Sequence, residues 1–386
     1  MKSRKPRVLS VIGTRPEAIK MAPVISLLSN DERFESYAVS TGQHREMLSS
    51  VVERFDISLD ADLELMRAGQ SLNSFISRAL QGIDLVYRDL RPDLVLIQGD
   101  TSSAMAAALA AFNHGARVAH LEAGLRTGNL RSPFPEEANR KIITQVSDLH
   151  LVPTRKSFGN LLAEGVDSSR IAITGNTVID ALQLAADWDV PFDDPRLEKA
   201  LRDDRKLVIV TTHRRENLKF VENFGRAINA SARRNADAIF ILPLHPNPRI
   251  EQLMLPFVQG LENVVVTHPL PYEQFVRLMK ASHLIVSDSG GIQEEAPALG
   301  KPVLIMRDST ERPEAVESGA NRLVGVRSEA IEREVNYLLT DDAAHKHMAT
   351  AINPYGDGKA AERVVSAIAQ LFNVGSRLSD FNPERP

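Results

Sequence analysis

The segment Asp288-Ser289-Gly290-Gly291 has the residue types of an anion site. It stands between the apolar run HLIVSD and the helical stretch IQEEAPALG. Glycines let the backbone turn tightly, so that free N–H groups and the positive end of the next helix face an anion such as a diphosphate. Ser289 adds a hydroxyl donor. Glu295, expected in the first turn of that helix, could accept both hydroxyls of a ribose. A plain strand–helix turn with a solvated Glu295 explains the segment about as well.

Two further donor clusters follow apolar runs. In GTRPE, Pro16 fits the first turn of a helix, which leaves Arg15 at its N-terminus, where a guanidinium can fork onto phosphate oxygens. Lys20 lies one turn further on. In THRREN (212–217), His213 stands beside two arginines and could hold the charge that develops on a leaving nucleotide. Each cluster alone fits surface ion pairs or a structural histidine. The three together favour a nucleoside diphosphate ligand.

Three acidic residues are candidates for proton transfer. Asp100 follows DLVLIQG, Glu122 follows VAHL, and Glu136 stands four residues before Arg140 in FPEEANR. Carboxylates in a closing cleft can be tuned into acid and base roles. Residues four apart share one helix face, so Glu136 and Arg140 also fit an ordinary ion pair.

Composition excludes several other kinds of chemistry. The 386 residues include no cysteine, which excludes disulfides, thiolate metal sites and a cysteine nucleophile. No histidine spacing is typical of a metal site. Neither GxGxxG after the first apolar run nor a P-loop sequence occurs, so we expect no cofactor and no metal. The net charge of −4 gives no general field for nucleic acid or a membrane surface.

The elements that must position these residues alternate between strand and helix. Strands are predicted in the first half at 7–12, 36–41, 93–98, 116–121, 148–153 and 170–175. Helical patterns between them cover 16–28, 72–89, 101–113 and 135–146. The strands are apolar throughout, which is typical of a parallel sheet covered by helices on both faces. The order restarts with strands at 206–212, 238–244, 263–269, 283–288, 301–306 and 321–326.

The length exceeds what one hydrophobic core usually accommodates, so two α/β domains are predicted, at 1–187 and 188–358. Segment 188–205, rich in Asp and Pro and without a clear period, is the expected junction, and the tail after Phe372 looks frayed. Ligands of open parallel sheets lie beyond the carboxyl ends of the strands, which favours an active site in the cleft between the domains. The apolar run at 8–12 is too short for a signal peptide and no stretch is long enough to span a membrane, so the expected location is the cytoplasm.

Six segments in this order resemble the non-hydrolysing UDP-N-acetylglucosamine 2-epimerases. They are GTRPEAIKMAP (13–23), QGDTSS (98–103), HLEAGLRT (120–127), SPFPEEANR (132–140), THRREN (212–217) and DSGGIQEEAPALGKP (288–302). The similarity runs from about residue 7 to about residue 358. The resemblance implies two Rossmann-like domains of glycosyltransferase-B architecture, with the last helix, at about 359–376, returning to the first domain. It also implies a homodimer.

The resemblance assigns roles to the candidate residues by motif. It implies that the diphosphate is bound by Arg15, His213, Ser289, Gly290 and Gly291. It also implies that Glu295 binds the ribose and that Leu270 and Phe275 in HPLPYEQF flank the uracil. It gives proton transfer to Asp100, Glu122 and Glu136, with Arg140 and Lys20 supporting the site, and makes His213 catalytic through the leaving diphosphate.

The implied reaction inverts carbon 2 of UDP-N-acetylglucosamine (UDP-GlcNAc) to give UDP-N-acetylmannosamine (UDP-ManNAc), a precursor for cell-surface polysaccharides. UDP is eliminated to leave 2-acetamidoglucal and is then added back. Two alternatives stay open. A glycosyltransferase of the same architecture would use a UDP-sugar donor and depend on an acceptor. A non-catalytic UDP-sugar sensor would need the phosphate donors but not all three carboxylates.

Overall fold

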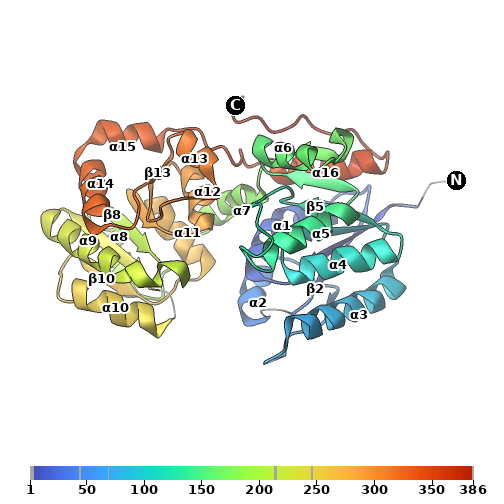
Figure 1. Ribbon diagram of the computed structural model, residues 1–386, viewed down its shortest axis with the longest axis horizontal. Helices are drawn as coiled ribbons and strands as arrows, with labels where there is room; N and C mark the ends of the chain where they lie inside the picture. Colours follow the sequence, from blue (N-terminus) through green and yellow to red (C-terminus); the bar gives the residue numbers. More distant parts are fainter. Residues whose placement is uncertain (1–3, 43–44, 68, 213–214, 245–246, 385–386) are drawn as a thin grey trace. The chain divides into compact units, whose positions relative to one another are not determined.

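In the computed structural model the chain folds into two compact units (Figure 1). Unit 1 comprises Met1–Ala181 and Tyr355–Pro386, and unit 2 comprises Leu182–Pro354. The structure describes residues 4–42, 45–67, 69–212, 215–244 and 247–384. No helix in this described part of the chain is long and apolar enough to cross a membrane.

Unit 1 is built on a seven-stranded parallel sheet with the strand order β3-β2-β1-β4-β5-β6-β7. The strands are β1 (Arg7–Ile12), β2 (Glu35–Ser40), β3 (Ala61–Asp62), β4 (Leu94–Gln98), β5 (Arg117–Leu121), β6 (Leu149–Val152) and β7 (Ile171–Ile173). Every residue of the central strand β4 is buried, because helices cover both faces of the sheet.

The helices of unit 1 form two layers on this sheet. Helices α3 (Leu72–Leu90), α4 (Ser102–Asn113) and α5 (Glu136–Val146) pack side by side in one layer, and α2 (Arg45–Arg54), α1 (Arg15–Ser29) and α16 (Ala360–Leu371) in the other. Alanines line α4, so that this buried helix can approach its neighbours closely. The remaining helices are α6 (Arg155–Ala163), the 3₁₀ turn η1 (Ser168–Arg170) and the first half of α7 (Thr177–Ala186), within which the boundary between the units falls.

Unit 2 contains a six-stranded parallel sheet with the strand order β10-β9-β8-β11-β12-β13. The strands are β8 (Lys206–Thr211), β9 (Ala238–Pro243), β10 (Val264–Thr267), β11 (Leu284–Ser287), β12 (Val303–Ile305) and β13 (Asn321–Leu323). The helices are α8 (Pro195–Leu201), η2 (Arg215–Phe220), α9 (Val221–Arg234), α10 (Pro248–Val258), α11 (Tyr272–Ala281), α12 (Gly290–Ala298), α13 (Pro313–Glu317), α14 (Ser328–Thr340) and α15 (Asp342–Ala349).

Each sheet has a topological switch point at its centre. The strand order reverses between β1 and β4 in unit 1 and between β8 and β11 in unit 2. Loops that leave the carboxyl ends of two such strands run in opposite directions, which opens the crevice where doubly wound sheets bind ligands. The segments GTRPE and GDT follow β1 and β4, and THRREN and DSGG follow β8 and β11. The candidate residues in these four segments therefore lie at the two switch points.

The predicted α/β fold and its predicted strands are confirmed, and three local differences remain. The two-residue strand β3 was not predicted, and the segment 188–205 contains helix α8, which Asp194 caps at its N-terminus. The expectation of a frayed tail is wrong. Phe381 is buried, its N–H donates to the Ile173 carbonyl at 2.8 Å, and Asp380 accepts the Ile173 N–H at 3.0 Å. The tail thus covers the open edge of β7, where unpaired backbone groups need partners.

Candidate active site

Lys20 and Glu122 meet at the carboxyl edge of the unit 1 sheet. Lys20 lies on α1, and its Nζ is 2.8 Å from Oε1 and 2.6 Å from Oε2 of Glu122, which directly follows β5. Gln98, the last residue of β4, donates its amide to Glu122 Oε2. The φ of Glu122 is 63°, a left-handed conformation that is uncommon for a residue with a Cβ and that clusters at functional sites. Two side-chain donors therefore hold this carboxylate in one orientation.

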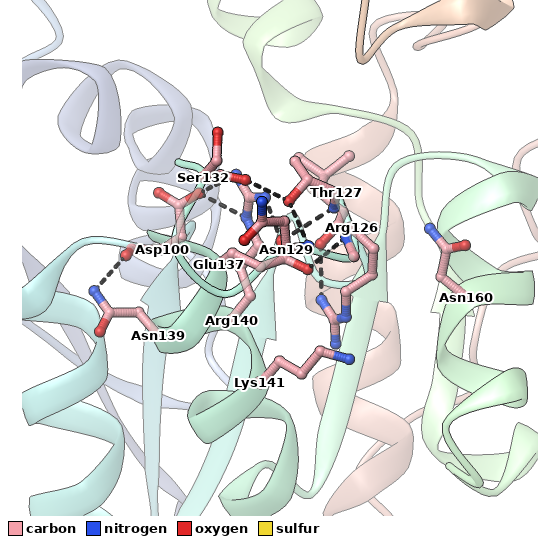
Figure 2. Close-up of polar contacts among 12 residues, drawn as sticks. Asp100, Arg126, Thr127, Asn129, Ser132, Glu137, Asn139, Arg140, Lys141 and Asn160 are labelled. Atoms are coloured by element: carbon pink, nitrogen blue, oxygen red, sulfur yellow. Dashed lines mark hydrogen bonds and ion pairs between the residues drawn. The ribbon is translucent and has the colours of Figure 1, made fainter. Parts of the chain in front are cut away.

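Arg140 joins two carboxylates that come from different segments (Figure 2). Its Nη2 and Nε lie 2.6 and 2.8 Å from Oδ2 of Asp100, in the loop between β4 and α4. Its Nη1 lies 2.9 Å from Oε2 of Glu137. Asn139, also on α5, donates its side-chain amide to the Asp100 carbonyl at 2.8 Å. Helix α5 thereby fixes both the backbone and the side chain of Asp100.

Glu137 is completely buried and holds the loop that follows β5. Its carboxylate accepts the backbone N–H groups of Thr127 and Gly128, each at 3.1 Å, in addition to the ion pair with Arg140 (Figure 2). Three donors are what a buried carboxylate needs to offset its lost hydration. On α5, the carboxylate paired with Arg140 is thus Glu137, three residues away. The four-residue spacing had allowed an ion pair between Arg140 and Glu136, but none is found among the described residues.

Glu136 and Arg15 each begin a helix and are half-buried. Glu136 is the first residue of α5 and follows two cis-proline peptide bonds, Ser132–Pro133 and Phe134–Pro135. Arg15 is the first residue of α1, with Pro16 second, as the sequence predicted. Among the described residues, no side-chain hydrogen bond or ion pair involves either of them. Their charged groups are therefore not engaged by the described part of the chain.

Two buried histidines lie on the neighbouring strands β5 and β6, side by side in the register. The Nε2 of His120 is 2.7 Å from the Gly99 carbonyl, so this nitrogen carries the proton. Burial lowers the pKa of His120 to about 4 and that of His150 to about 3. Both imidazoles are neutral near pH 7 and belong to the support of the site.

In unit 2 the DSGG segment forms the start of α12. Ser289 is the N-cap and Gly290 and Gly291 are the first two helical residues, whose N–H groups lack acceptors within the helix. A Cβ on Gly290 would lie 2.7 Å from Nη1 of Arg312, whose guanidinium is paired with Glu294 at 2.5 Å. A larger residue at this position would have to displace the paired guanidinium from the helix start. A positive helix end next to a guanidinium favours an anion.

Asp288 joins the two loops at the unit 2 switch point. It is fully buried, and its Oδ2 accepts the Thr212 hydroxyl and the Asn217 side-chain amide, each at 3.0 Å. Thr212 directly follows β8, and Asn217 lies in η2. His213 stands between Thr212 and Asn217 in the sequence and is predicted to bind the diphosphate. It lies outside the described residues.

The predicted ribose and uracil residues are also in unit 2. Glu295 is buried, but it is the sixth residue of α12 and lies in the second turn. The predicted first-turn position is wrong because the helix already begins at Gly290. Leu270 is half-buried in the loop before α11, and Phe275 is half-buried on α11 itself.

The structure brings Lys20 together with Glu122 and Asp100 together with Arg140, and it puts Ser289, Gly290 and Gly291 at one helix start. Sequence reasoning missed the supporting roles of Gln98, Glu137 and Asp288. It also missed Glu17, whose spacing from Thr14 is the signal of a capping box. Within the described ranges no group of three His, Asp or Glu residues could hold a metal ion.

Two doubly wound parallel sheets with polar loops at both switch points define a two-domain protein of glycosyltransferase-B architecture. The glycosyltransferase of kitacinnamycin shares this fold at 13% identity, with a TM-score of 0.64 over 95% of this chain and 99% of that one. The sequence profile of the UDP-N-acetylglucosamine 2-epimerase family matches residues 26–369. The chain belongs to this family.

Individual relatives match over nearly their whole length. The UDP-N-acetylglucosamine 2-epimerase of Escherichia coli K12 is 46% identical over 368 residues, which cover 94% of this chain and 98% of that protein. The Neisseria meningitidis UDP-GlcNAc 2-epimerase, solved with UDP-GlcNAc bound, is 42% identical with a TM-score of 0.85, over 94% of this chain and all of that one. S. aureus MnaA, whose structure was solved with UDP, is 37% identical with a TM-score of 0.87. The match covers 98% of this chain and 100% of that one.

Proposed function

We propose that this protein interconverts UDP-GlcNAc and UDP-ManNAc by inverting carbon 2 of the sugar, without hydrolysing the nucleotide. The observation that carries the proposal is the pair of oriented carboxylates at the carboxyl edge of the unit 1 sheet, Glu122 with Lys20 and Asp100 with Arg140. A binding protein would need no such pair. Family membership over residues 26–369 and the bound UDP-GlcNAc of the Neisseria relative support the choice of substrate.

The chemistry requires a leaving group, because carbon 2 has no adjacent carbonyl to acidify its proton. In the proposed elimination a base removes the carbon-2 proton, and the C–H electron pair becomes the double bond between carbons 1 and 2. The bond from carbon 1 to the diphosphate oxygen breaks, and its electrons leave with UDP. Re-addition returns UDP to carbon 1 and a proton to the other face of carbon 2. Catalysis therefore needs proton donors and acceptors on two faces and stabilisation of the departing diphosphate.

The carboxylates of unit 1 supply the proton transfers in this proposal. Lys20 and Gln98 orient Glu122, and Arg140 orients Asp100, whereas Glu136 is half-buried and is not engaged by another described side chain. We assign Asp100, Glu122 and Glu136 to the steps at carbon 2. Oriented groups cost little reorganisation at the moment of reaction, which favours Asp100 and Glu122. Glu136 is assigned because no described side chain engages its carboxylate.

The donors of the diphosphate come from helix starts in this proposal. The N–H groups of Gly290 and Gly291 and the Ser289 hydroxyl face the phosphates, with Arg15 at the start of α1 and His213 as further donors. Glu295 takes the ribose, and Leu270 and Phe275 flank the uracil. We further propose a cytoplasmic homodimer that supplies UDP-ManNAc for cell-surface polysaccharide synthesis.

Proton NMR of the protein with UDP-GlcNAc in deuterated water tests the proposed function. We expect UDP-ManNAc to appear with deuterium at carbon 2. Glu122→Gln should abolish the exchange, and Glu32→Gln, an exposed carboxylate of the same unit, should retain it. Free N-acetylmannosamine with UDP would mean a hydrolysing enzyme. Sugar transfer that starts only when an acceptor is added would mean a glycosyltransferase, and bound but unchanged UDP-GlcNAc would mean a sensor.

A further inference from the structure

Glu17 is a buried carboxylate that lies between two loops of unit 1. Only 2% of its surface is exposed. Its Oε2 accepts the backbone N–H groups of Gly13 at 2.8 Å and Thr14 at 2.6 Å. Its Oε1 accepts the Thr101 hydroxyl at 2.5 Å. The first two donors belong to the loop after β1, and the third belongs to the loop after β4.

This arrangement exceeds what a helix cap requires. As the third residue of α1, a glutamate in a capping box needs only to accept the N–H of the N-cap, Thr14, and it can do so at the surface. Here the carboxylate is buried, and its other oxygen reaches Thr101, the N-cap of α4. Burial raises the pKa of Glu17, while the hydrogen bonds lower it. A glutamate that served only as a cap would not need to lose its hydration.

The two loops that Glu17 joins carry the residues of the proposed chemistry. Arg15 directly follows Thr14, and Asp100 directly precedes Thr101. The loops leave β1 and β4, the two strands at the switch point. Gly13 is packed so tightly against this junction that a Cβ on it would lie 2.5 Å from the Ser103 hydroxyl. The distance between Arg15 and Asp100 is thus set through a rigid, buried contact.

We propose that Glu17 is a positioning residue: by tying the start of α1 to the start of α4, it sets the diphosphate donor Arg15 against the proton-transfer residue Asp100. This inference rests on the proposed function for the roles of Arg15 and Asp100. The tie itself is a property of the fold. Glu17 touches no reacting atom, and its effect passes through the two loop backbones.

Thr101 offers a clean way to cut the tie, because Thr154 is its matched control. Each threonine is an N-cap whose hydroxyl oxygen accepts the N–H three residues on, at 3.1 Å from Ala104 and at 3.2 Å from Ser157. Only Thr101 also donates to Glu17. The Thr101→Val and Thr154→Val variants therefore lose the same kind of cap, and only the first loses the tie.

The two variants should differ in turnover. We expect Thr101→Val to lower kcat for epimerisation at least about tenfold, since small displacements of catalytic groups are costly, while Thr154→Val stays within about twofold of the wild type. Thr101→Ser, which keeps the hydroxyl, should recover most of the loss. The dissociation constant of UDP should change less than kcat, because the donors on α12 are untouched. Equal losses in the two valine variants would overturn the inference.

A second pair of variants keeps the helix cap. Aspartate is a good N-cap, so Thr101→Asp and Thr154→Asp should both fold. At position 101 it places a second carboxylate against Glu17, and we expect turnover to fall at least as far as in Thr101→Val. If Thr101→Asp and Thr154→Asp have the same turnover, Glu17 has no positioning role.

Hydrogen exchange separates a failure of this inference from a failure of the proposed function. The amides of Gly13 and Thr14 should exchange at least about tenfold faster in Thr101→Val than in Thr154→Val, whatever reaction the protein catalyses. A wild type without carbon-2 exchange would overturn the proposed function and leave the tie to be judged by this comparison. Unchanged amide protection in Thr101→Val would reject the tie even in an active epimerase.

Discussion

Glu136 and Glu137 are consecutive carboxylates in opposite surroundings. Glu137 is buried and accepts two backbone N–H groups besides pairing with Arg140. Glu136 is half-buried, and the described part of the chain offers it no side-chain partner. A carboxylate held by three donors suits the support of a loop, whereas one without such donors can take up and release a proton at a substrate. We therefore infer different roles for these two identical side chains: loop support for Glu137 and proton transfer for Glu136.

The same substitution at each position should separate these roles. We expect Glu136→Gln to lower kcat by about 10²- to 10⁴-fold, the range for loss of a general acid or base, with a change in stability within about 0.5 kcal/mol. Glu137→Gln should lower the free energy of unfolding by about 2–3 kcal/mol, because a buried ion pair and a charged acceptor are lost. Turnover and denaturant unfolding of both variants measure the contrast.

The dissociation constant of UDP serves as a check on both variants, since neither carboxylate is assigned to the nucleotide. It should stay within about threefold of the wild-type value. If Glu136→Gln is destabilised as strongly as Glu137→Gln while keeping its turnover, the division of roles is wrong.

At the scale of elements, the start of α12 depends on one glycine more than on the next. A Cβ on Gly290 would lie 2.7 Å from Nη1 and 3.0 Å from Cζ of Arg312, and ion pairs with Glu294 and Glu311 hold that guanidinium in place. A Cβ on Gly291 would meet only the Ser289 hydroxyl, at 4.0 Å. The two positions therefore differ in steric room although both are helical.

We expect Gly290→Ala to lower the free energy of unfolding by about 1–3 kcal/mol, as overpacking does, and to weaken UDP binding by moving Arg312. Gly291→Ala should leave stability unchanged or raise it, because alanine is favoured over glycine in a helix by about 1 kcal/mol. Thermal unfolding and calorimetric titration with UDP distinguish the two. A loss of stability in Gly291→Ala equal to that in Gly290→Ala would contradict this account of the helix start.

The helices and strands that carry the site could be predicted because their signals are local. Apolar runs gave β1, β4, β8 and β11, and Pro16 marked the start of α1. The short strand β3 has too few residues to show a pattern. The tail was missed because its order depends on Phe381 and on the edge of β7, some two hundred residues earlier.

Partners of the site residues were harder to predict than the residues themselves. Spacing on α5 allowed Arg140 to reach Glu136, but the helix turns Glu137 toward it, and Asp100 approaches from another loop. Glu17 and Thr101 are 84 residues apart, so no local sequence pattern predicts their contact. The sequence shows which side chain stands at a position. Which acceptor a donor reaches depends on the order of the strands in the sheet.

At the scale of the whole molecule, histidines with lowered pKa values shape the response to acid: two are in unit 1, and burial also lowers the pKa of His283 in unit 2 to about 4. Burial lowers the pKa of His120 to about 4 and that of His150 to about 3, against an ordinary value near 6.5. In acid the unfolded chain therefore binds more protons than the folded chain. The free energy of unfolding falls as the pH drops below about 6.5. Each histidine costs about 2 kcal/mol between pH 6.5 and 5.

Two buried carboxylates, Glu17 and Asp180, oppose this trend, because burial raises the pKa of each. Burial raises the pKa of Asp180, which accepts the Ala361 N–H at 2.8 Å, to about 6. The folded chain then takes up a proton before the unfolded chain does, so stability rises as the pH falls from about 6 toward 4. Between pH 6.5 and 5 the gain from Asp180 is about 1 kcal/mol, which is less than the combined cost of the two histidines over the same range. With His283 adding a loss of the same sign, we expect the protein to lose stability on mild acidification.

His150→Leu tests this balance, because His150 is fully buried and neither ring nitrogen has a hydrogen-bond partner among the described residues. The wild type should unfold at a lower temperature at pH 5.0 than at pH 7.5. In His150→Leu we expect that loss to shrink by about 2 kcal/mol, since one of the histidines with a lowered pKa no longer titrates. His347→Leu, which removes an exposed histidine on α15 of unit 2, should keep the full loss. An acid response that is the same in all three proteins would mean that groups other than the buried histidines of unit 1 set it.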